Sequence, residues 1–262
     1  MTTTPPRNEA VYIHDVADHP LVDPQILLPH VIDRIRPESV VDVGCGIGTF
    51  LHVCKDLGVS QVLGVDGEWV DRDLLFGHIS PHEFRSVDLA TDMPLELPRH
   101  DLAICLEVAE HLDGSCAASL VQSLVAASDC VLFSAAIPGQ GGQHHVNEQW
   151  PEYWAALFAA HEYVMADVVR PLVWDEPRIS YWYRQNCFLA VRSDKQEILK
   201  QFPTWSDVST GVLSLVHPEL LQDKVDAHGS WEERVFSGGL KTRSYLYLMA
   251  RSVLRRITER AG

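Results

Sequence analysis

The sequence predicts an α/β protein with a doubly wound, mostly parallel sheet of seven strands and a helical C-terminal extension. Three observations support this fold class. The β-branched run from Val40 to Val43 leads directly into a glycine-rich loop and a helical segment. Apolar strand segments then alternate with helical or turn segments, as in parallel sheets with right-handed crossovers. Several of these strand segments also end at an acidic residue.

The hydrophobic periodicity gives the order of the elements. A helix is expected from His19-Pro20 to Arg36, where the following Pro37 ends it. Five strands are expected near residues 39–43, 61–65, 83–87, 101–106 and 129–135, with a helix at 115–127 before the last. The segment from Gln185 to Val191 is expected to pair antiparallel with Tyr163 to Val169 at the sheet edge.

This order divides the chain into three parts. Residues 1–20 are polar and contain prolines, so we expect a loosely ordered segment. Residues 21–192 are expected to form the main domain, and residues 193–262 a mainly helical extension. The apolar stripe from Leu246 to Ile257, with arginines interspersed and after it, predicts a docked terminal helix. The alternatives are contact with a membrane surface or with a partner, first a second copy in a homodimer.

The strongest local signal is the run D-x-G-x-G-x-G, which begins at Asp42 and ends at Gly48. Its glycines permit a sharp turn and close backbone approach, and the helix starting near Ile47 directs free N–H groups toward a ligand. A dinucleotide fingerprint would need Gly or Ala where Thr49 stands. The run therefore indicates a nucleotide-cofactor site and disfavours, without eliminating, a nicotinamide dehydrogenase.

More acidic residues follow at the ends of later strands. Asp66 ends the second strand, where a carboxylate can accept hydrogen bonds from both ribose hydroxyls. Asp88 and Glu107 hold corresponding places after the third and fourth strands. Most of these acidic residues also have a structural explanation, such as a helix cap for Asp66 or an Asx turn for Asp88. Glu110, three residues after Glu107, could be a solvated residue at a helix start. Together they favour a ligand-binding site, because open parallel sheets bind ligands at the carboxyl ends of their strands.

These motifs, with the Leu106-Glu107-Val108-Ala109-Glu110-His111-Leu112 run, resemble class I S-adenosylmethionine-dependent methyltransferases over about residues 38–192. The resemblance implies a Rossmann-like methyltransferase fold and S-adenosylmethionine as the cofactor. It also implies a role in cofactor binding for ten residues. These are Asp42, Gly44, Cys45, Gly46 and Gly48 in the loop, Asp66 and Gly67 at the ribose, Asp88 and Leu89 at the adenine, and Glu107 near the methionine part.

The acceptor site is expected in the loop from Ser134 to Pro151, which is rich in glycine and hydrogen-bonding side chains. Its Pro-Gly-Gln-Gly-Gly and His-Val-Asn-Glu-Gln-Trp-Pro motifs, with Tyr-Arg-Gln-Asn at 183–186, resemble bacterial methyltransferases of polysaccharide or specialised-metabolite synthesis. We expect His145 to be the catalytic base, with His144 and Glu148 beside it. Substrate binding is expected from Asn147, Gln149, Trp150, Tyr183 and Arg184.

Simpler roles remain open for this region. A loop histidine can hydrogen-bond to backbone rather than take a proton. His144, His145 and Glu148 would hold a zinc-like or magnesium-like ion only with further ligands, so no metal is expected. Aromatic residues at helical spacing after Trp150 fit core packing better than a pocket wall.

Composition limits the partners and the location of the protein. The chain has 36 acidic and 21 basic residues and a net charge of −15, which disfavours a nucleic acid. Its six cysteines show no C-x-x-C pair, and no apolar run of membrane-spanning length or signal-peptide start is present. We therefore expect a cytoplasmic protein with free thiols and no integral membrane association.

The expected function is S-adenosylmethionine-dependent methyl transfer to a small-molecule or sugar-like acceptor, preferably at oxygen. Two alternatives keep the same cofactor. One is non-methylating chemistry, either aminocarboxypropyl transfer or cyclisation. The other is a catalytically idle scaffold that only binds the cofactor.

Overall fold

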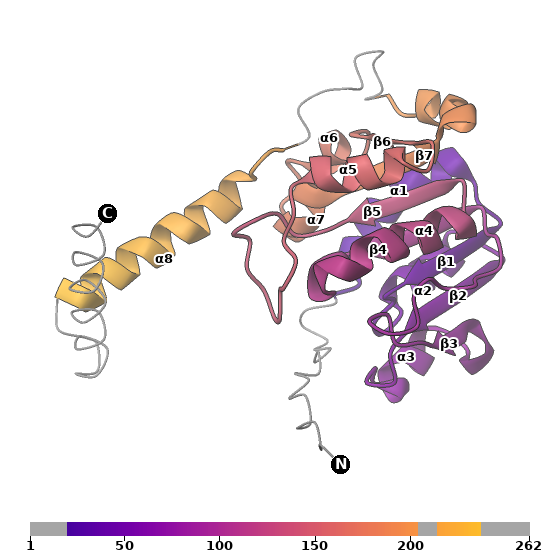
Figure 1. The fold of residues 1–262 in the computed structure, drawn as a ribbon, viewed down its shortest axis with the longest axis horizontal. Helices are drawn as coiled ribbons and strands as arrows, with labels where there is room; N and C mark the ends of the chain where they lie inside the picture. The colour runs from indigo at the N-terminus through magenta and orange to yellow at the C-terminus, as the bar shows by residue number, and fades with distance from the viewer. Residues whose placement is uncertain (1–19, 204–213, 237–262) are drawn as a thin grey trace. The chain divides into compact units, whose positions relative to one another are not determined.

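A computed structural model of the chain describes residues 20–203 and 214–236 (Figure 1). The chain divides into two compact units, residues 1–215 and 216–262. The first unit contains one mixed sheet between helices (Figure 1). The described part of the second is the helix α8, Pro218–Phe236. The predicted C-terminal stripe and dimer contact lie outside the described residues.

The sheet has seven strands in the order β3-β2-β1-β4-β5-β7-β6. The first five pair in parallel, and β7 pairs antiparallel with both β5 and β6. This topology confirms the predicted doubly wound sheet, including its antiparallel edge. The strands are β1 Ser39–Val43, β2 Gln61–Asp66, β3 Phe84–Ser86, β4 Leu102–Leu106, β5 Cys130–Ser134, β6 Tyr163–Ala166 and β7 Phe188–Arg192.

Helices cover both faces of this sheet (Figure 1). The α-helices of the first unit are α1 Val22–Ile35, α2 Thr49–Asp56, α3 Arg72–His78, α4 Ala117–Ala127, α5 Pro151–Ala159, α6 Arg170–Val173 and α7 Tyr181–Asn186. Short 3-10 helices are η1 Pro81–Glu83, η2 Ala109–His111, η3 Gly114–Cys116 and η4 Ser193–Gln201.

Consecutive residues of the central strands point into two different cores. Val40 belongs to the core that contains Leu51 of α2, whereas Val41 belongs to the core that contains Leu124 of α4 and Trp154 of α5. All five of these side chains are at most 1% exposed. Burial on both faces explains why the strands are continuously apolar in sequence.

Three predicted strands begin or end elsewhere. The strand expected from Tyr163 to Val169 ends at Ala166. The strand expected from Gln185 begins at Phe188, because Gln185 and Asn186 complete α7 and their amides hydrogen-bond in a side-chain network. The strand expected at 83–87 is only three residues long. Pro81 starts η1, and the Glu83 carboxylate accepts a hydrogen bond from the Ser80 amide at 2.7 Å, so the chain turns there before β3.

Residues beyond the predicted boundary at 192 pack into the first unit. Leu199 and Phe202 are at most 2% exposed and join the core that contains α1. The described core therefore continues past 192. No described helix is both long and apolar enough to cross a membrane.

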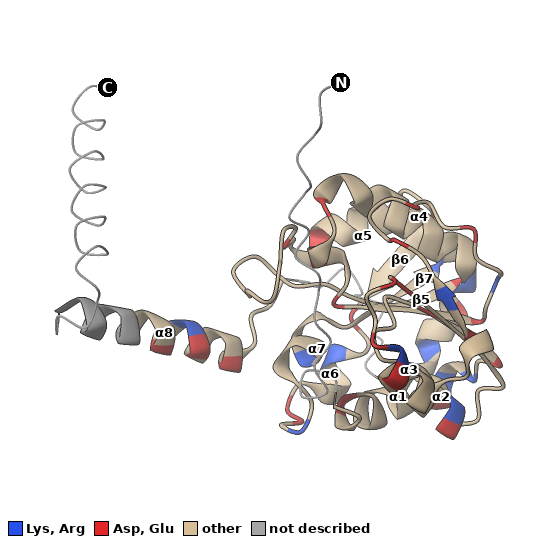
Figure 2. Ribbon diagram, turned by 90° about the horizontal axis from the view of Figure 1, so that it is seen from below, with Lys and Arg blue, Asp and Glu red and all other residues tan. Residues whose placement is uncertain are grey.

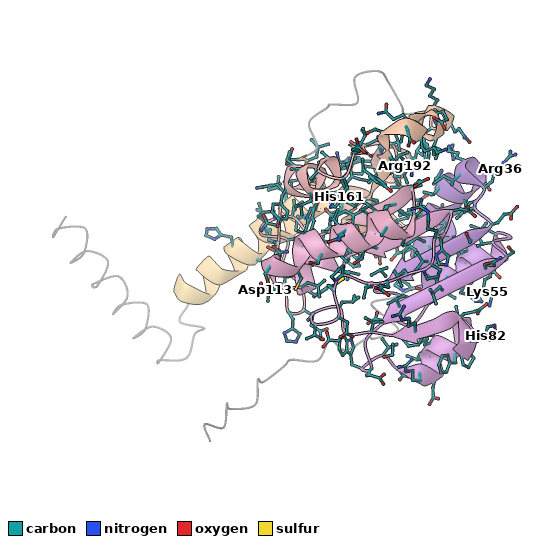
Figure 3. The ribbon with its side chains drawn as sticks, turned by 45° about the vertical axis from the view of Figure 1, so that its right-hand side comes forward. Arg36, Lys55, His82, Asp113, His161 and Arg192 are labelled. Carbon is teal, nitrogen blue, oxygen red and sulfur yellow. The ribbon has the colours of Figure 1, made fainter. Side chains whose placement is uncertain are left out.

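The surface of the first unit carries basic and acidic residues interspersed over its helices (Figure 2). Arg36, Lys55 and Arg192 lie at its periphery (Figure 3). Lys55 pairs with Glu83 at 2.8 Å. All six cysteines are free thiols.

Candidate functional site at the carboxyl edge of the sheet

Five segments meet where the parallel strands end. They are the glycine loop after β1, Asp66 at the end of β2, Asp88 after β3, residues 107–111 after β4, and the loop after β5. The strand register places these ends at one edge, as the sequence predicted. Ligands of open α/β sheets bind at this edge.

The glycine loop needs its glycines for backbone geometry and for space. Gly44, Gly46 and Gly48 have φ of 84°, 51° and 82°, in the left-handed region that side chains disfavour. A Cβ on Gly44 would also lie 2.3 Å from Cγ2 of Val108. Amides of Gly44 and Cys45 donate to the Val65 carbonyl at 2.7 and 3.2 Å, which holds the loop against β2.

Two buried carboxylates lie behind this loop. Oδ2 of Asp66 accepts from the Gly46 amide at 2.8 Å, and Oδ1 accepts from the Gly67 amide at 2.6 Å. Asp42 is 3% exposed, and burial, followed by the negative charge of Asp66, raises its pKa to about 8. A positively charged ligand near this pair would favour ionised Asp42.

Trp69 is a neighbour of this pair that the sequence interpretation missed. A Cβ on Gly67 would lie 2.2 Å from its ring, so the indole rests against the Gly67 backbone. The residue is 42% exposed. The sequence signal for it is a tryptophan three positions after the strand-end carboxylate.

Asp88 and Leu89 have different environments. Oδ1 of Asp88 accepts from the Ala90 amide at 2.8 Å, which is the Asx turn considered as its structural explanation. Leu89 is 4% exposed and belongs to the core on the α4 side. The adenine contacts implied for both residues stay predictions.

Glu107 is the centre of an amide network. Its carboxylate accepts from Nδ2 of Asn186 at 3.1 Å and from Nε2 of Gln140 at 3.0 Å, and Gln185 donates to Gln140 at 3.1 Å. Burial raises the pKa of Glu107, although the hydrogen bonds, first that from Asn186, oppose this shift. Glu107 also has a φ of 52°, a strained conformation often found at functional sites.

The sequence interpretation missed the amide partners of Glu107. Gln140 belongs to the quoted Pro-Gly-Gln-Gly-Gly motif, and Gln185 and Asn186 to the Tyr-Arg-Gln-Asn motif. Their joint presence in two motifs was the available signal. Asn186 and Gln140 hold Glu107 directly, and Gln185 supports it through Gln140.

Glu110 and His111 follow on η2. Glu110 is completely buried, and burial, then the negative charge of Glu107, raises its pKa well above the usual range. Burial, then the charge of His145, lowers the pKa of His111 to about 4. His111 is therefore a neutral imidazole near pH 7.

The loop after β5 pairs His145 with Glu148. Nδ1 of His145 lies 3.0 Å from Oε1 of Glu148. The Glu148 carboxylate also accepts from the amides of Gly139 and Gly141 at 2.7 and 2.6 Å. Burial tends to raise the pKa of Glu148, but these bonds, first that from His145, lower it below its ordinary value. Glu148 thus orients His145 as an ionised carboxylate.

The other predicted loop residues differ in exposure. Asn147 is 5% exposed, and its Oδ1 accepts from Gln149 at 3.0 Å, so both amides stabilise the loop. Trp150 precedes α5 and is 41% exposed. His144 is exposed and has a φ of 57°. The structure therefore brings His145 and Glu148 together and leaves His144 at the surface.

The two residues predicted on α7 are both buried. Tyr183 is 6% exposed and makes an edge contact with Phe50, with ring centroids 5.4 Å apart. Arg184 is 3% exposed, and its Nη1 donates to the Trp174 carbonyl at 3.4 Å. These contacts support the fold, and the substrate-binding roles stay predictions.

Comparison with known proteins identifies no family. No protein-family model matches the sequence, and no curated protein matches it. Solved structures with related folds include an amino pentose methyltransferase from Micromonospora echinaspora, crystallised with S-adenosylmethionine. The two chains are 17% identical with a TM-score of 0.49, over 71% of this chain and 100% of that one.

Two further structures have similar scores. A sugar N-methyltransferase from Streptoalloteichus is 14% identical with a TM-score of 0.49, over 73% of this chain and 98% of that one. Human N-acetylserotonin methyltransferase is 16% identical with a TM-score of 0.45, over 65% of this chain. This chain spans about half of that enzyme, 52% of its length. Likeness at this level carries no conclusion about activity.

Proposed function

We propose that the chain binds S-adenosylmethionine at the carboxyl edge of the sheet and transfers its methyl group to a small-molecule or sugar-like acceptor. The observation that carries the proposal is the pair of buried carboxylates, Asp42 and Asp66, directly behind a glycine loop. Dinucleotide-binding folds also place a carboxylate where Asp66 stands, so Asp42 makes the distinction. Ionised Asp42 would repel the pyrophosphate of a nicotinamide dinucleotide, whereas the sulfonium and ammonium groups of S-adenosylmethionine favour this ionised form.

The residues present fit this cofactor. Both oxygens of Asp66 accept backbone N–H groups, and a carboxylate offers about four acceptor positions, so this group is suited to accept from ribose hydroxyls as well. A Cβ at Gly44 would meet Val108, so only glycine keeps the loop this close to the segment after β4. Glu107 lies at the next strand end. When bound, S-adenosylmethionine supplies an electrophilic methyl group on its sulfonium.

The chain must then position the acceptor, exclude water and remove a proton when the acceptor is a hydroxyl. We assign acceptor activation to His145. Glu148 accepts from Nδ1 and so stabilises the tautomer in which Nε2 has an available lone pair. In the simplest case this nitrogen takes the hydroxyl proton. A base beside the acceptor suits transfer to a hydroxyl oxygen, which must lose a proton.

Calorimetric titration with S-adenosylmethionine and NAD side by side tests the cofactor assignment. We expect binding of S-adenosylmethionine alone. Asp66→Ala should weaken it at least about tenfold, because hydrogen bonds to a charged group are lost. The control is Asp56→Ala, whose side chain is 64% exposed on α2. Binding of NAD in preference, or equal affinity in Asp66→Ala, would contradict the proposal.

Product analysis separates methyl transfer from the other uses of the cofactor. Methyl transfer yields S-adenosylhomocysteine and a methylated acceptor. Aminocarboxypropyl transfer or cyclisation yields products of different mass. A binding scaffold would bind the cofactor and consume none of it with any acceptor.

A further inference from the structure

A second set of side chains at this edge has the composition of a metal site. Glu110 and His111 belong to η2 after β4, and His145 belongs to the loop after β5. One oxygen or nitrogen atom from each of the three lies within 4.8 Å of the others. The two imidazole rings make an edge contact with centroids 4.9 Å apart.

The backbone holds these two segments together. Amides of Val146 and Asn147 donate to the Glu110 carbonyl at 2.8 and 3.0 Å. The loop residue His145 is therefore held beside η2 by hydrogen bonds that do not involve the three side chains themselves. The cluster is a consequence of the fold and does not depend on a contact between exposed side chains.

Glu110 is the unusual member. It is 0% exposed, and in the described part of the chain no hydrogen-bond donor has bonding geometry to either carboxylate oxygen. The backbone amides of Glu110 and Ala136 and the carboxyl group of Glu107 lie near it without completing a bond. No ion pair among the described residues includes it. A buried carboxyl group without a close hydrogen bond is unusual, and a bound cation would stabilise its ionised form.

His145 has the surroundings of a metal ligand. A ligating histidine commonly donates its other ring N–H to a carboxylate, which orients the ring and selects the tautomer. Glu148 provides this carboxylate at 3.0 Å, and Gly139 and Gly141 hold it. The ring edge of His145 that carries Nε2 packs against Gly142, where a Cβ would lie 2.2 Å from Nε2, so this ring position requires glycine at 142.

We propose that Glu110, His111 and His145 bind a divalent first-row transition-metal ion, with Glu148 orienting His145. One carboxylate and two imidazoles form a ligand set used by catalytic zinc and by non-haem iron, with positions left open for other ligands. Metal–ligand bonds of about 2.1 Å at tetrahedral angles place two ligands of one ion about 3.4 Å apart. The three atoms, which lie within 4.8 Å of one another, would close by up to about 1.4 Å, shared between their side chains, when an ion binds.

This set differs from the one considered in the sequence. His144 is exposed, and Glu148 hydrogen-bonds to His145 rather than completing the ligand set. The role of the ion in turnover rests on the proposed function, whereas its binding does not. An ion on Nε2 of His145 would occupy the lone pair that otherwise takes a proton, so the ion would then activate the acceptor in place of a free imidazole.

The test is calorimetric titration of chelator-treated, untagged full-length protein with Zn²⁺ and with Co²⁺. The visible spectrum of bound Co²⁺ gives a second readout. We expect one equivalent to bind, with affinity at least about tenfold weaker in Glu110→Gln and His145→Ala. Glu148→Gln should weaken binding about tenfold or more without abolishing it. His161→Ala, at an exposed histidine after α5 (Figure 3), is the control and should bind like wild type.

Circular dichroism shows whether each variant is folded, and Zn²⁺ should raise the Tm of wild type more than that of Glu110→Gln. The metal-site proposal is overturned if wild type binds neither ion, or if both cluster variants bind as wild type does. Titration of the same samples with S-adenosylmethionine tests the proposed function separately. If wild type binds S-adenosylmethionine but no metal ion, the metal-site proposal fails. If it binds a metal ion but no S-adenosylmethionine, the proposed function fails.

Discussion

At the residue scale, function depends on side chains whose partners come from distant parts of the chain. Glu148 is an example, because two backbone amides and His145 share its carboxylate. The sequence suggested Glu148 as a catalytic neighbour of His145. The structure adds that its oxygens are already engaged, which makes it an orienting group.

His145→Ala tests the residue assigned to acceptor activation. We expect turnover to fall at least about tenfold, with donor affinity within a few-fold of wild type, because a group acting on the acceptor is removed. The measurements are steady-state kinetics and calorimetry with S-adenosylmethionine. His161→Ala is the matched control. Wild-type turnover in His145→Ala would remove His145 from the mechanism, whereas its role as a metal ligand is decided by the metal titration.

At the element scale, the connection from β1 to α2 requires glycine at position 44 for two reasons, its backbone conformation and the space available. Gly44 has a φ of 84°, and its α-position faces Val108 from the segment after β4. Gly58, after α2, has a φ of 93°, and a Cβ added there would meet no atom within 4 Å. A comparison of alanine substitutions at Gly44 and Gly58 therefore separates the cost of backbone strain from the cost of steric overlap with Val108.

Gly44→Ala should destabilise the protein more than Gly58→Ala. Both variants incur about 1–2 kcal/mol from a left-handed alanine, and Gly44→Ala adds about 1–3 kcal/mol of overpacking. Urea unfolding measures the difference, and we also expect weaker donor binding in Gly44→Ala alone. Equal losses of stability would mean that the contact with Val108 relaxes freely.

The elements themselves were predictable where the pattern is local. The strand from Ser39 to Val43 and the helix from Pro151 follow from β-branched residues and from a proline in the first turn. The end of α7 was not predictable, because Gln185 and Asn186 have their hydrogen-bond partners on Glu107 and Gln140. Tertiary contacts outweighed the local preference there.

At the scale of the whole molecule, buried acids make stability depend on pH. The pKa of Asp42 is about 8 in the folded chain and 3.8 ordinarily, so the folded state holds a proton that the unfolded state releases. The free energy of unfolding therefore falls as pH rises toward 8. His111 acts in the opposite direction, but only between pH 4 and its ordinary pKa of 6.5.

Asp42→Asn should reduce this pH dependence. Between about pH 6.5 and pH 8, wild type should lose about 1–2 kcal/mol through Asp42, at about 1.4 kcal/mol per pH unit while the proton is held. Asp42→Asn has no proton to release at this position, so the free energy of unfolding that it loses between the two pH values should be smaller by about 1–2 kcal/mol. Urea unfolding at the two pH values, without added cofactor or metal, measures it. The same slope in both proteins would show that Asp42 is already ionised.

The sequence by itself determined the strand order along the chain, the glycine loop and the strand-end carboxylates, including Asp42 and Asp66. These features follow from the alternation of side chains along a strand and from the backbone conformations that glycine permits. They also follow from the rule that open parallel sheets bind ligands at the carboxyl ends of their strands. Only the tertiary structure decided that Glu110 and His111 meet His145, and that Asn186 and Gln140 hold Glu107. The physical reason is that these groups come from separate strand ends, and only folding sets the distance between them.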